Sequence, residues 1–217
     1  MAYGAIAAPL QLAELPTLSF PLPGGWQLST HPIKGAEAPK EVLEYLYGVF
    51  SKELQDGRTY PQEGPMDYPA FIAYFFASTT IVGVVHTEPQ TSVPQTLEEA
   101  LGGRDPVEAI GGCYYIKPNY PGRSSHNCNA GFIVPPTHRG KKIGYNLGKS
   151  YLEYAPRLGY KASVFNLVYK NNVASLKIWD SLGFQRVGLI PNAGRLRTQD
   201  GLGEEYVDAV VVHKSFV

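Results

Sequence analysis

The sequence contains few cysteines, no net charge and no long apolar run. Only two of its 217 residues are cysteine, Cys113 and Cys128, and both fall in apolar segments that read as strands. Two cysteines give neither a disulfide framework nor the spacing of a metal site, so we expect two buried, reduced thiols and no metal. Because no run of about 18 apolar residues is present, no transmembrane helix and no membrane partner are expected.

The sequence also lacks a targeting signal and an excess of positive or negative charge. The N-terminus has no basic segment followed by a long apolar core, so no signal peptide is expected. This favours the cytoplasm, with the mitochondrial matrix or the nucleus as alternatives. The 19 Lys and Arg residues balance the 19 Asp and Glu residues. A nucleic-acid-binding protein normally carries a basic excess, so we expect no nucleic-acid partner.

The length is that of one domain. Residues 1–25 contain several prolines and end in two glycines, which predicts an extended N-terminal arm with an edge strand at 18–22, followed by a domain at 26–217. Alternating or apolar segments predict strands at 26–33, 79–86, 109–116, 127–134, 162–168, 184–190 and 206–214. Helical periodicity predicts helices at 39–57, 69–77, 142–158 and 172–182. We interpret 87–107 as a surface insertion and 191–205 as a loop. The fold class is therefore α+β, with a mixed sheet flanked by helices.

The segment from Gly131 to Gly144 is the most informative in the chain. An apolar strand ends at two prolines, a basic turn containing Gly140 follows, and helical periodicity then begins. The first amide N–H groups of a helix lack partners inside it, and the helix dipole adds positive charge there. Glycine allows close backbone approach, and Arg139, Lys141 and Lys142 add formal charge. This pattern predicts a site for a phosphate-bearing ligand.

Four asparagines lie at or near strands that should converge on that site: Asn127, Asn129, Asn166 and Asn172. Asparagine is disfavoured in strands, so each one caps a turn or contacts a ligand. We favour a ligand role for Asn129 and Asn166, which stand in otherwise apolar strands. For Asn172, capping of the helix that follows is the better interpretation.

The basic turn and the segment after it resemble the GCN5-related N-acetyltransferase superfamily. The resemblance rests on Arg139-Gly140-Lys141-Lys142-Ile143-Gly144, followed by Asn172-x-x-Ser175-x-x-x-Trp179-x-x-x-Gly183-Phe184. It implies a twisted, mostly antiparallel sheet that splays apart between two strands to admit acetyl-CoA. The implied cofactor-binding residues are Phe132, Ile133, Val134, His138, Arg139, Gly140, Lys141, Lys142, Ile143, Gly144, Asn172, Ser175 and Trp179. Lys142 departs from the pattern, because the superfamily places a glycine there.

Longer runs resemble a yeast branch of this superfamily that acetylates L-azetidine-2-carboxylate and related cyclic imino acids. They are 115–120, 125–132, 165–168, 177–180 and 184–186, with Thr59-Tyr60-Pro61-Gln62 also similar. By this resemblance, Asn166 and the backbone of Leu167 hold the carboxylate of the substrate, and Asn129 forms a hydrogen bond with the substrate. Asn172 orients a water near the amine, so Asn172 and Asn129 are the candidate catalytic residues. A homodimer is also implied.

The proton transfers are not explained by these residues. Many members of the superfamily protonate the leaving thiolate with a tyrosine at the position of Trp179, which cannot act as an acid. The motif strands contain no Asp or Glu to serve as a base, so a water chain through Asn172 is our hypothesis. We interpret His126 as an exposed strand-end residue and His138 as support for the phosphate loop. Tyr74, Phe75 and Phe76 are more simply core residues than walls of an acceptor pocket.

Two other functions stay open at this level. The same fold could acetylate another amine, such as an amino acid, a polyamine or a protein N-terminus. A non-catalytic CoA-binding module is the alternative from a different class, which Lys142 and Trp179 favour and the asparagines oppose. A polyamine site would require an acidic cleft, which the motif strands do not supply.

Overall fold

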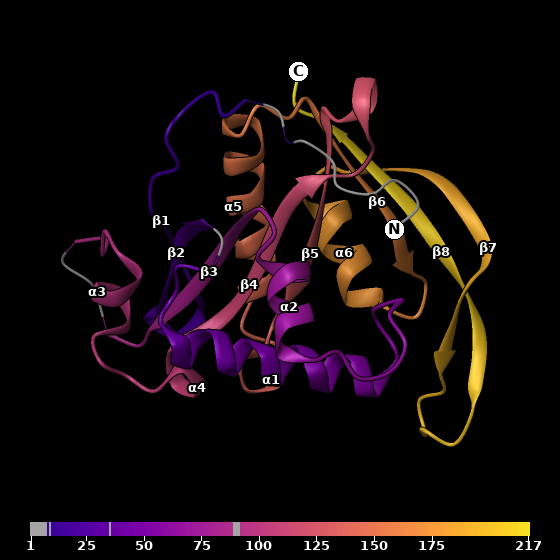
Figure 1. Ribbon diagram of the computed structural model, residues 1–217, viewed down its shortest axis with the longest axis horizontal. Helices are drawn as coiled ribbons and strands as arrows, with labels where there is room; N and C mark the ends of the chain where they lie inside the picture. Colours follow the sequence, from indigo (N-terminus) through magenta and orange to yellow (C-terminus); the bar gives the residue numbers. More distant parts are fainter. Residues whose placement is uncertain (1–7, 9, 35, 89–91) are drawn as a thin grey trace.

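The computed structural model describes residues 8, 10–34, 36–88 and 92–217, and its centre is an eight-stranded sheet (Figure 1). The strand order is β1-β2-β3-β4-β5-β6-β8-β7, and only the β5–β6 pair is parallel. The strands are β1 (Leu18–Pro21), β2 (Gln27–Lys34), β3 (Thr79–His86), β4 (Ile110–Pro118), β5 (Asn127–Ile133), β6 (Ala162–Tyr169), β7 (Gln185–Arg197) and β8 (Glu204–Ser215). The predicted α+β class and its mostly antiparallel sheet are confirmed.

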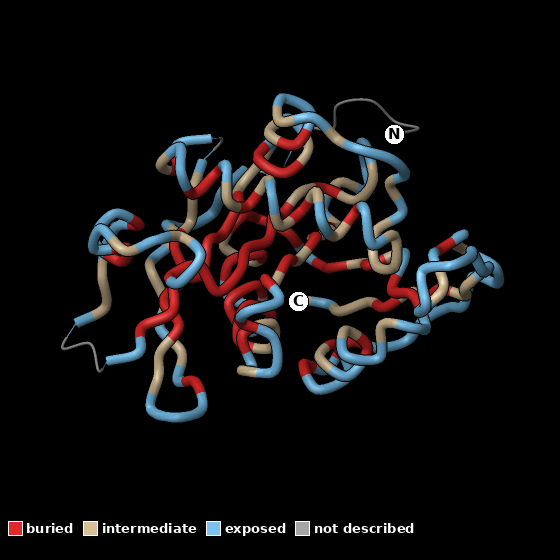
Figure 2. The backbone as a smooth tube through the Cα atoms, turned by 90° about the horizontal axis from the view of Figure 1, so that it is seen from below, coloured by how far each residue is buried: buried red, intermediate tan, exposed pale blue. Residues whose placement is uncertain are grey.

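Helices cover both faces of the sheet. They are α1 (Lys40–Asp56), α2 (Tyr68–Phe75), α3 (Leu97–Leu101), α4 (Pro106–Ala109), α5 (Ile143–Arg157) and α6 (Val173–Ser181). The apolar faces of α1 to α4 form one buried cluster against the sheet, and those of α5 and α6 form another on the opposite face. Figure 2 shows the buried residues gathered at the centre of the molecule, with exposed residues towards its periphery. Within the described ranges, no helix is long and apolar enough to cross a membrane.

The expected N-terminal arm lies against the domain where the structure describes it. Strand β1 pairs with β2, and the N–H groups of Leu12 and Ala13 donate to the carbonyl of Arg157 at the end of α5. Residues 1–7 and 9 of the predicted arm lie outside the described residues. Both cysteines are free and buried, as predicted, and burial raises the pKa of the Cys128 thiol to about 12.

Two predicted loops contain regular structure. The segment 87–107, interpreted as a surface insertion, contains α3 and the start of α4, although residues 89–91 lie outside the described part of the chain. A capping box between Thr96 and Glu99 begins α3, and Leu97 and Leu101 are buried beneath it. The predicted loop 191–205 is the end of a long β7–β8 hairpin whose strands extend to Arg197 and from Glu204. The sequence did not predict this extension. Most of β7 is exposed, and its polar and glycine residues interrupt the apolar alternation of a strand.

The sheet divides between its parallel strands. Strands β5 and β6 pair only at Asn127–Ala162 and Cys128–Ser163, and then diverge. On its other side, β6 loses regular pairing with β8 between Phe165 and Val168, so Asn166 and Leu167 lie in an irregular stretch. This divergence confirms the predicted splaying of the two strands, and it leaves a gap through the middle of the sheet.

A buried polar cluster lies away from this gap, between β2 and β3. The Ser29 hydroxyl lies 2.8 Å from Nε2 of His31 and 2.7 Å from Nε2 of His86. Burial and the neighbouring His86 lower the pKa of His31 from 6.5 to about 4, with Glu99 acting in the opposite direction. Burial, followed by Arg104, also lowers the pKa of His86. Both imidazoles are therefore neutral in the folded protein at neutral pH.

We predict an acid-sensitive stability that depends on His31. The folded-state pKa of His31 lies below its unfolded value of 6.5. Its contribution to the free energy of unfolding is therefore fully present above about pH 6.5 and is lost as the pH decreases towards 4. For this one group the loss amounts to about 3 kcal/mol. Urea unfolding at several pH values should show a weaker pH dependence in His31→Gln than in wild type. His126→Gln, at an exposed position, is the control, and equal slopes in all three proteins would contradict the assignment.

Candidate functional site

The gap between β5 and β6 opens into a cavity of about 720 Å³. Its walls come from β5, β6, the β5–α5 loop and the first turns of α5 and α6, with residues 53 and 59–61 and Tyr74 closing the other side. Segments distant in the sequence therefore meet at one site. Of the predicted site residues, those that line the cavity are Asn129, Phe132, Ile133, Val134, His138, Arg139, Gly140, Lys142, Ile143, Gly144, Asn166, Leu167, Asn172, Ser175 and Trp179.

Lys141 is the predicted site residue that does not line the cavity. Its ammonium donates to the Thr137 carbonyl at 3.0 Å and lies 5.0 Å from the ring centroid of Trp26. The side chain therefore belongs to the packing of the loop against the N-terminal segment. The sequence could not distinguish Lys141 from Arg139 and Lys142, because all three are basic residues of the same turn.

The loop before α5 has the backbone geometry of an anion site. Gly140 has φ of 77°, and Lys142, the residue before the helix, has φ of 60° and ψ of 14°. A non-glycine residue in this left-handed region is strained by about 1–2 kcal/mol. No side chain caps the first amides of α5, so they stay available to a ligand. Lys142 thus keeps the conformation that glycine normally supplies.

Two further loop residues hold the loop in place. At Gly144 a Cβ would come within 3.3 Å of Ile178, so the missing side chain lets α5 approach α6 closely. His138 is buried, with Nε2 3.4 Å from the Val107 carbonyl. Burial and then Lys141 lower its pKa, so the imidazole is neutral at pH 7. His138 therefore supports the loop without adding charge.

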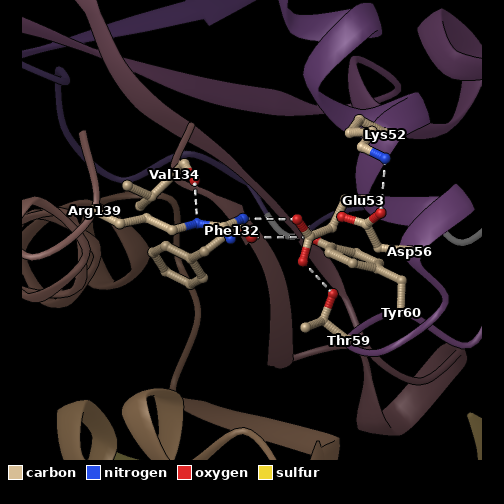
Figure 3. A network of polar contacts seen from close by, with 8 residues as sticks. All are labelled: Lys52, Glu53, Asp56, Thr59, Tyr60, Phe132, Val134 and Arg139. Atoms are coloured by element: carbon tan, nitrogen blue, oxygen red, sulfur yellow. Dashed lines mark hydrogen bonds and ion pairs between the residues drawn. The ribbon is translucent and has the colours of Figure 1, made fainter. Parts of the chain in front are cut away.

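The carbonyls along the open edge of β5 are capped by side chains from elsewhere in the chain (Figure 3). The Tyr60 hydroxyl donates to the Phe132 carbonyl at 3.0 Å, and Arg139 Nε donates to the Val134 carbonyl at 3.1 Å. The N–H and C=O of one strand residue point to the same side of the strand. The N–H groups of Phe132 and Val134 consequently face the gap beside carbonyls that already have donors.

Arg139 also pairs with Glu53 across the cavity. One guanidinium N–H lies 2.8 Å from a Glu53 carboxylate oxygen, and the Thr59 hydroxyl donates to the other at 2.6 Å (Figure 3). The Glu53 side chain is 15% exposed. Among the described residues that line the cavity, Glu53 is the one carboxylate. Sequence reasoning missed it because it lies on α1, although the similar run beginning at Thr59 marked the adjacent segment.

Aromatic side chains form the wall on the α5–α6 side. The Trp179 ring lies 4.6 Å from Phe165 and 5.1 Å from Phe132, centroid to centroid. Its indole N–H donates to the Ser175 hydroxyl at 2.9 Å. The Trp179 N–H is therefore satisfied, whereas the Ser175 hydroxyl, which accepts this bond, keeps its own O–H donor.

The asparagines meet around Asn119, a residue that the sequence analysis did not single out. The amide nitrogens of Asn129 and Asn166 donate to its oxygen at 3.0 and 2.8 Å. The Asn166 oxygen in turn accepts from Asn119 at 3.2 Å and from the Tyr120 hydroxyl at 2.9 Å. Asn119 and Tyr120 end the first of the similar runs, 115–120, which was the available signal. For the Asn129 oxygen, the described residues provide no hydrogen-bond donor.

The other two asparagines have structural partners. Asn172 caps α6 by accepting the Ser175 N–H at 3.1 Å, as expected, and it also lines the cavity. Asn127 donates to the Ser124 carbonyl and lies at the closed end of the β5–β6 pair, so it does not join the cavity walls. The neighbouring His126 is exposed, as interpreted from the sequence.

The opposite wall is partly aromatic. Tyr74 lines the cavity with its hydroxyl 3.0 Å from that of Tyr115, whereas Phe75 and Phe76 are buried in the core. At Gly131 a Cβ would lie 2.6 Å from the Tyr115 ring, so only glycine leaves room for this tyrosine. In the described part of the chain, no group of three or more His, Cys, Asp or Glu side chains could hold a metal ion.

Known proteins match both the sequence and the fold. The family model "Acetyltransferase (GNAT) family" matches residues 43–184. The N-acetyltransferase aca1 of Schizosaccharomyces pombe is 40% identical over 191 residues, which is 88% of each chain. A GCN5-related N-acetyltransferase from Kribbella flavida superposes with a TM-score of 0.67 at 23% identity, over 86% of this chain and 97% of that one. The structure of yncA from Salmonella typhimurium with its cofactor acetyl-CoA gives a TM-score of 0.61 at 15% identity, over 87% and 94%.

We predict that Arg139 and Lys141 differ in their effect on an anionic ligand. Calorimetry with coenzyme A should show an affinity about tenfold lower for Arg139→Ala, the range expected when one charge-assisted hydrogen bond is lost. Lys141→Ala should change it by less than about twofold, because the Lys141 ammonium faces Thr137 and Trp26. Equal losses in the two variants would show that the loop acts only through net charge.

Proposed function

Because the chain belongs to the acetyltransferase (GNAT) family, and is thereby an N-acetyltransferase, we propose that it acetylates a small cyclic imino acid with acetyl-CoA. Azetidine-2-carboxylate, cis-4-hydroxyproline and a proline-derived metabolite are the acceptors we propose. The observation that carries the acceptor is the amide cluster of Asn119, Asn129 and Asn166 beside the cavity. Neutral amides can bind both the carboxylate and the ring nitrogen of a zwitterion.

The gap and the loop support the placement of the cofactor. The pantetheine would enter between the diverging strands, against the N–H groups of Phe132 and Val134. Donors of this kind stabilise the developing oxyanion by about 3 kcal/mol. The pyrophosphate would lie on the first amides of α5, near Arg139 and Lys142. Held at both ends, the acetyl group is oriented towards the acceptor.

The acceptor would bind at the asparagine end of the gap. We assign its carboxylate to the Asn166 amide and the backbone of Leu167, which lies in the irregular stretch of β6. The Asn129 oxygen would accept a hydrogen bond from the ring nitrogen. The intervening Asn119 fixes both amides, so this part of the site is formed before the substrate arrives.

Proton transfer is assigned to water. The amine must lose a proton before it attacks, and Glu53, the carboxylate on the cavity wall, is already paired with Arg139. Asn172 uses its oxygen to cap α6 and retains its amide nitrogen for a water beside the amine. Since the Trp179 N–H is bound to Ser175, water would also protonate the thiolate of coenzyme A.

A homodimer is part of this proposal. Strand β7 forms one edge of the sheet and exposes Val187 (56%), Leu189 (52%) and Ile190 (40%). An exposed apolar edge strand readily pairs with a second chain. Sedimentation velocity should give twice the monomer mass, and a monomer at micromolar concentration would exclude the dimer.

The test of the acceptor is thiol release from acetyl-CoA by the purified protein. Azetidine-2-carboxylate, cis-4-hydroxyproline, proline and spermidine should be assayed in parallel. We expect turnover with cyclic imino acids and none with spermidine. Turnover with spermidine or a peptide amine alone would assign another acceptor, and binding of acetyl-CoA without any turnover would identify a non-catalytic module.

We predict that Asn166→Ala acts on the acceptor alone. Loss of a hydrogen bond to a charged group should raise the acceptor KM about 10- to 100-fold, while the KM for acetyl-CoA stays within about twofold. Steady-state kinetics with each substrate varied in turn measures both values. Arg139→Ala should show the reverse pattern and is the matched control. Equal increases in both KM values for Asn166→Ala would indicate a folding defect instead.

A further inference from the structure

Lys117 is a partly buried cation next to the asparagine cluster. In the antiparallel β4–β5 pair it stands directly opposite Asn129, and Tyr115 stands opposite Gly131. Residues two apart on a strand, and residues opposite one another, share one face of the sheet. Lys117, Tyr115 and Asn129 are therefore neighbours on one face, and the latter two line the cavity.

The ammonium of Lys117 rests on two aromatic rings. It lies 4.2 Å from the ring centroid of Tyr74 and 4.1 Å from that of Tyr115. The two phenol hydroxyls are bound to each other at 3.0 Å. Contacts with ring faces attract a cation, but no hydrogen bond joins its N–H donors to an oxygen of the described residues.

No anion compensates this charge within the described residues. Lys117 takes part in none of the ion pairs found there, whose basic members are Lys40, Lys52, Arg139, Lys170, Arg186 and Arg195. Burial lowers its pKa to about 8, and no carboxylate acts in the opposite direction. The facing titratable groups are the phenols of Tyr74 and Tyr115, and burial raises the pKa of Tyr115 well above its usual value. A partly desolvated cation with no anion beside it is less stable than one in water, which points to an anion supplied by a ligand.

We propose that Lys117 is a specificity-determining residue that binds the carboxylate of the acceptor, so that the acceptor class is amines bearing an α-carboxylate. This inference rests on the proposed function and names a charged partner for the carboxylate in addition to the neutral amides. The same cation repels a polyamine or a lysine side chain, since these acceptors carry no anion to offset it.

Neutralising the carboxylate also assists the reaction. In a free imino acid the carboxylate stabilises the protonated amine, because an opposite charge nearby favours the charged form. An ion pair with Lys117 weakens that effect and lowers the pKa of the bound amine. The site can then obtain a neutral nucleophile although Glu53 is committed to Arg139.

The decisive comparison uses two acceptors that differ only in whether they carry the negative charge of the carboxylate. Azetidine-2-carboxylate and azetidine-2-carboxamide should be assayed with wild type, Lys117→Met and Lys117→Arg. In Lys117→Met we expect the KM for the acid to rise about 10- to 100-fold. The KM values for the amide and for acetyl-CoA should change by less than about twofold, and Lys117→Arg should recover much of the loss. An equal change for acid and amide, or no change, overturns the role of Lys117.

A pH series separates charge from structure. The N-acetylated product retains the carboxylate but has no titrating amine, so its affinity reports on the site. By calorimetry, wild-type affinity should fall as the pH rises through about 8, where Lys117 loses its proton. In Lys117→Arg it should stay constant up to pH of about 10, since arginine remains charged. Parallel profiles would overturn the inference. A wild-type protein that acetylates neither the acid nor the amide overturns the proposed function as well.

Discussion

The divergence of two neighbouring strands is the constraint on which the site depends. Strands β5 and β6 pair at only two positions and then separate, which removes ladder hydrogen bonds in the interior of the sheet. Buried backbone groups must be satisfied in another way. Tyr60 and Arg139 satisfy the carbonyls of Phe132 and Val134, and the N–H groups are left for a ligand. The free backbone groups along the opening are thus hydrogen-bond donors, which suit the oxygen of an acyl group.

Packing keeps the opening from collapsing. Phe132 stacks on Tyr114 at 4.5 Å and meets Trp179 at 5.1 Å, so a rigid aromatic layer extends from β4 to α6. Gly144 and Gly148 let α5 approach α6, since a Cβ at Gly148 would lie 2.6 Å from Leu182. Aromatic side chains also exclude water from the wall, which strengthens electrostatic interactions inside the cavity.

Local patterns predicted the parts of the site that are contiguous in sequence. The strand, the glycine turn and the helix from Ile143 follow from periodicity and capping rules, and the resemblance supplied the splayed sheet. Residues that reach the site through tertiary structure were not predictable in this way. Glu53 lies on α1, and Asn119 follows β4; similar runs lie at or beside both residues, but local pattern does not indicate that they meet Arg139 and Asn166. Lys141 is the opposite case: it lies within the motif, but its side chain points away from the cavity.

The β7–β8 hairpin was shortened in our prediction because polar residues and Gly194 interrupt the strand pattern.

The distribution of charge connects the two ends of the cavity. At one end Arg139 and Lys142 accompany the helix amides on the cavity wall, and near the other Lys117 contacts the rings of Tyr74 and Tyr115, which line the wall. Both ends are therefore suited to anions, and Glu53, the carboxylate on the wall, is neutralised by Arg139. Acetyl-CoA and an imino acid each carry an anion remote from the atom that reacts. Anchoring the two anions at opposite ends would bring the thioester and the amine together between them. Substrate orientation would then follow from where the chain places its charges, with little need for a charged group at the reacting atoms.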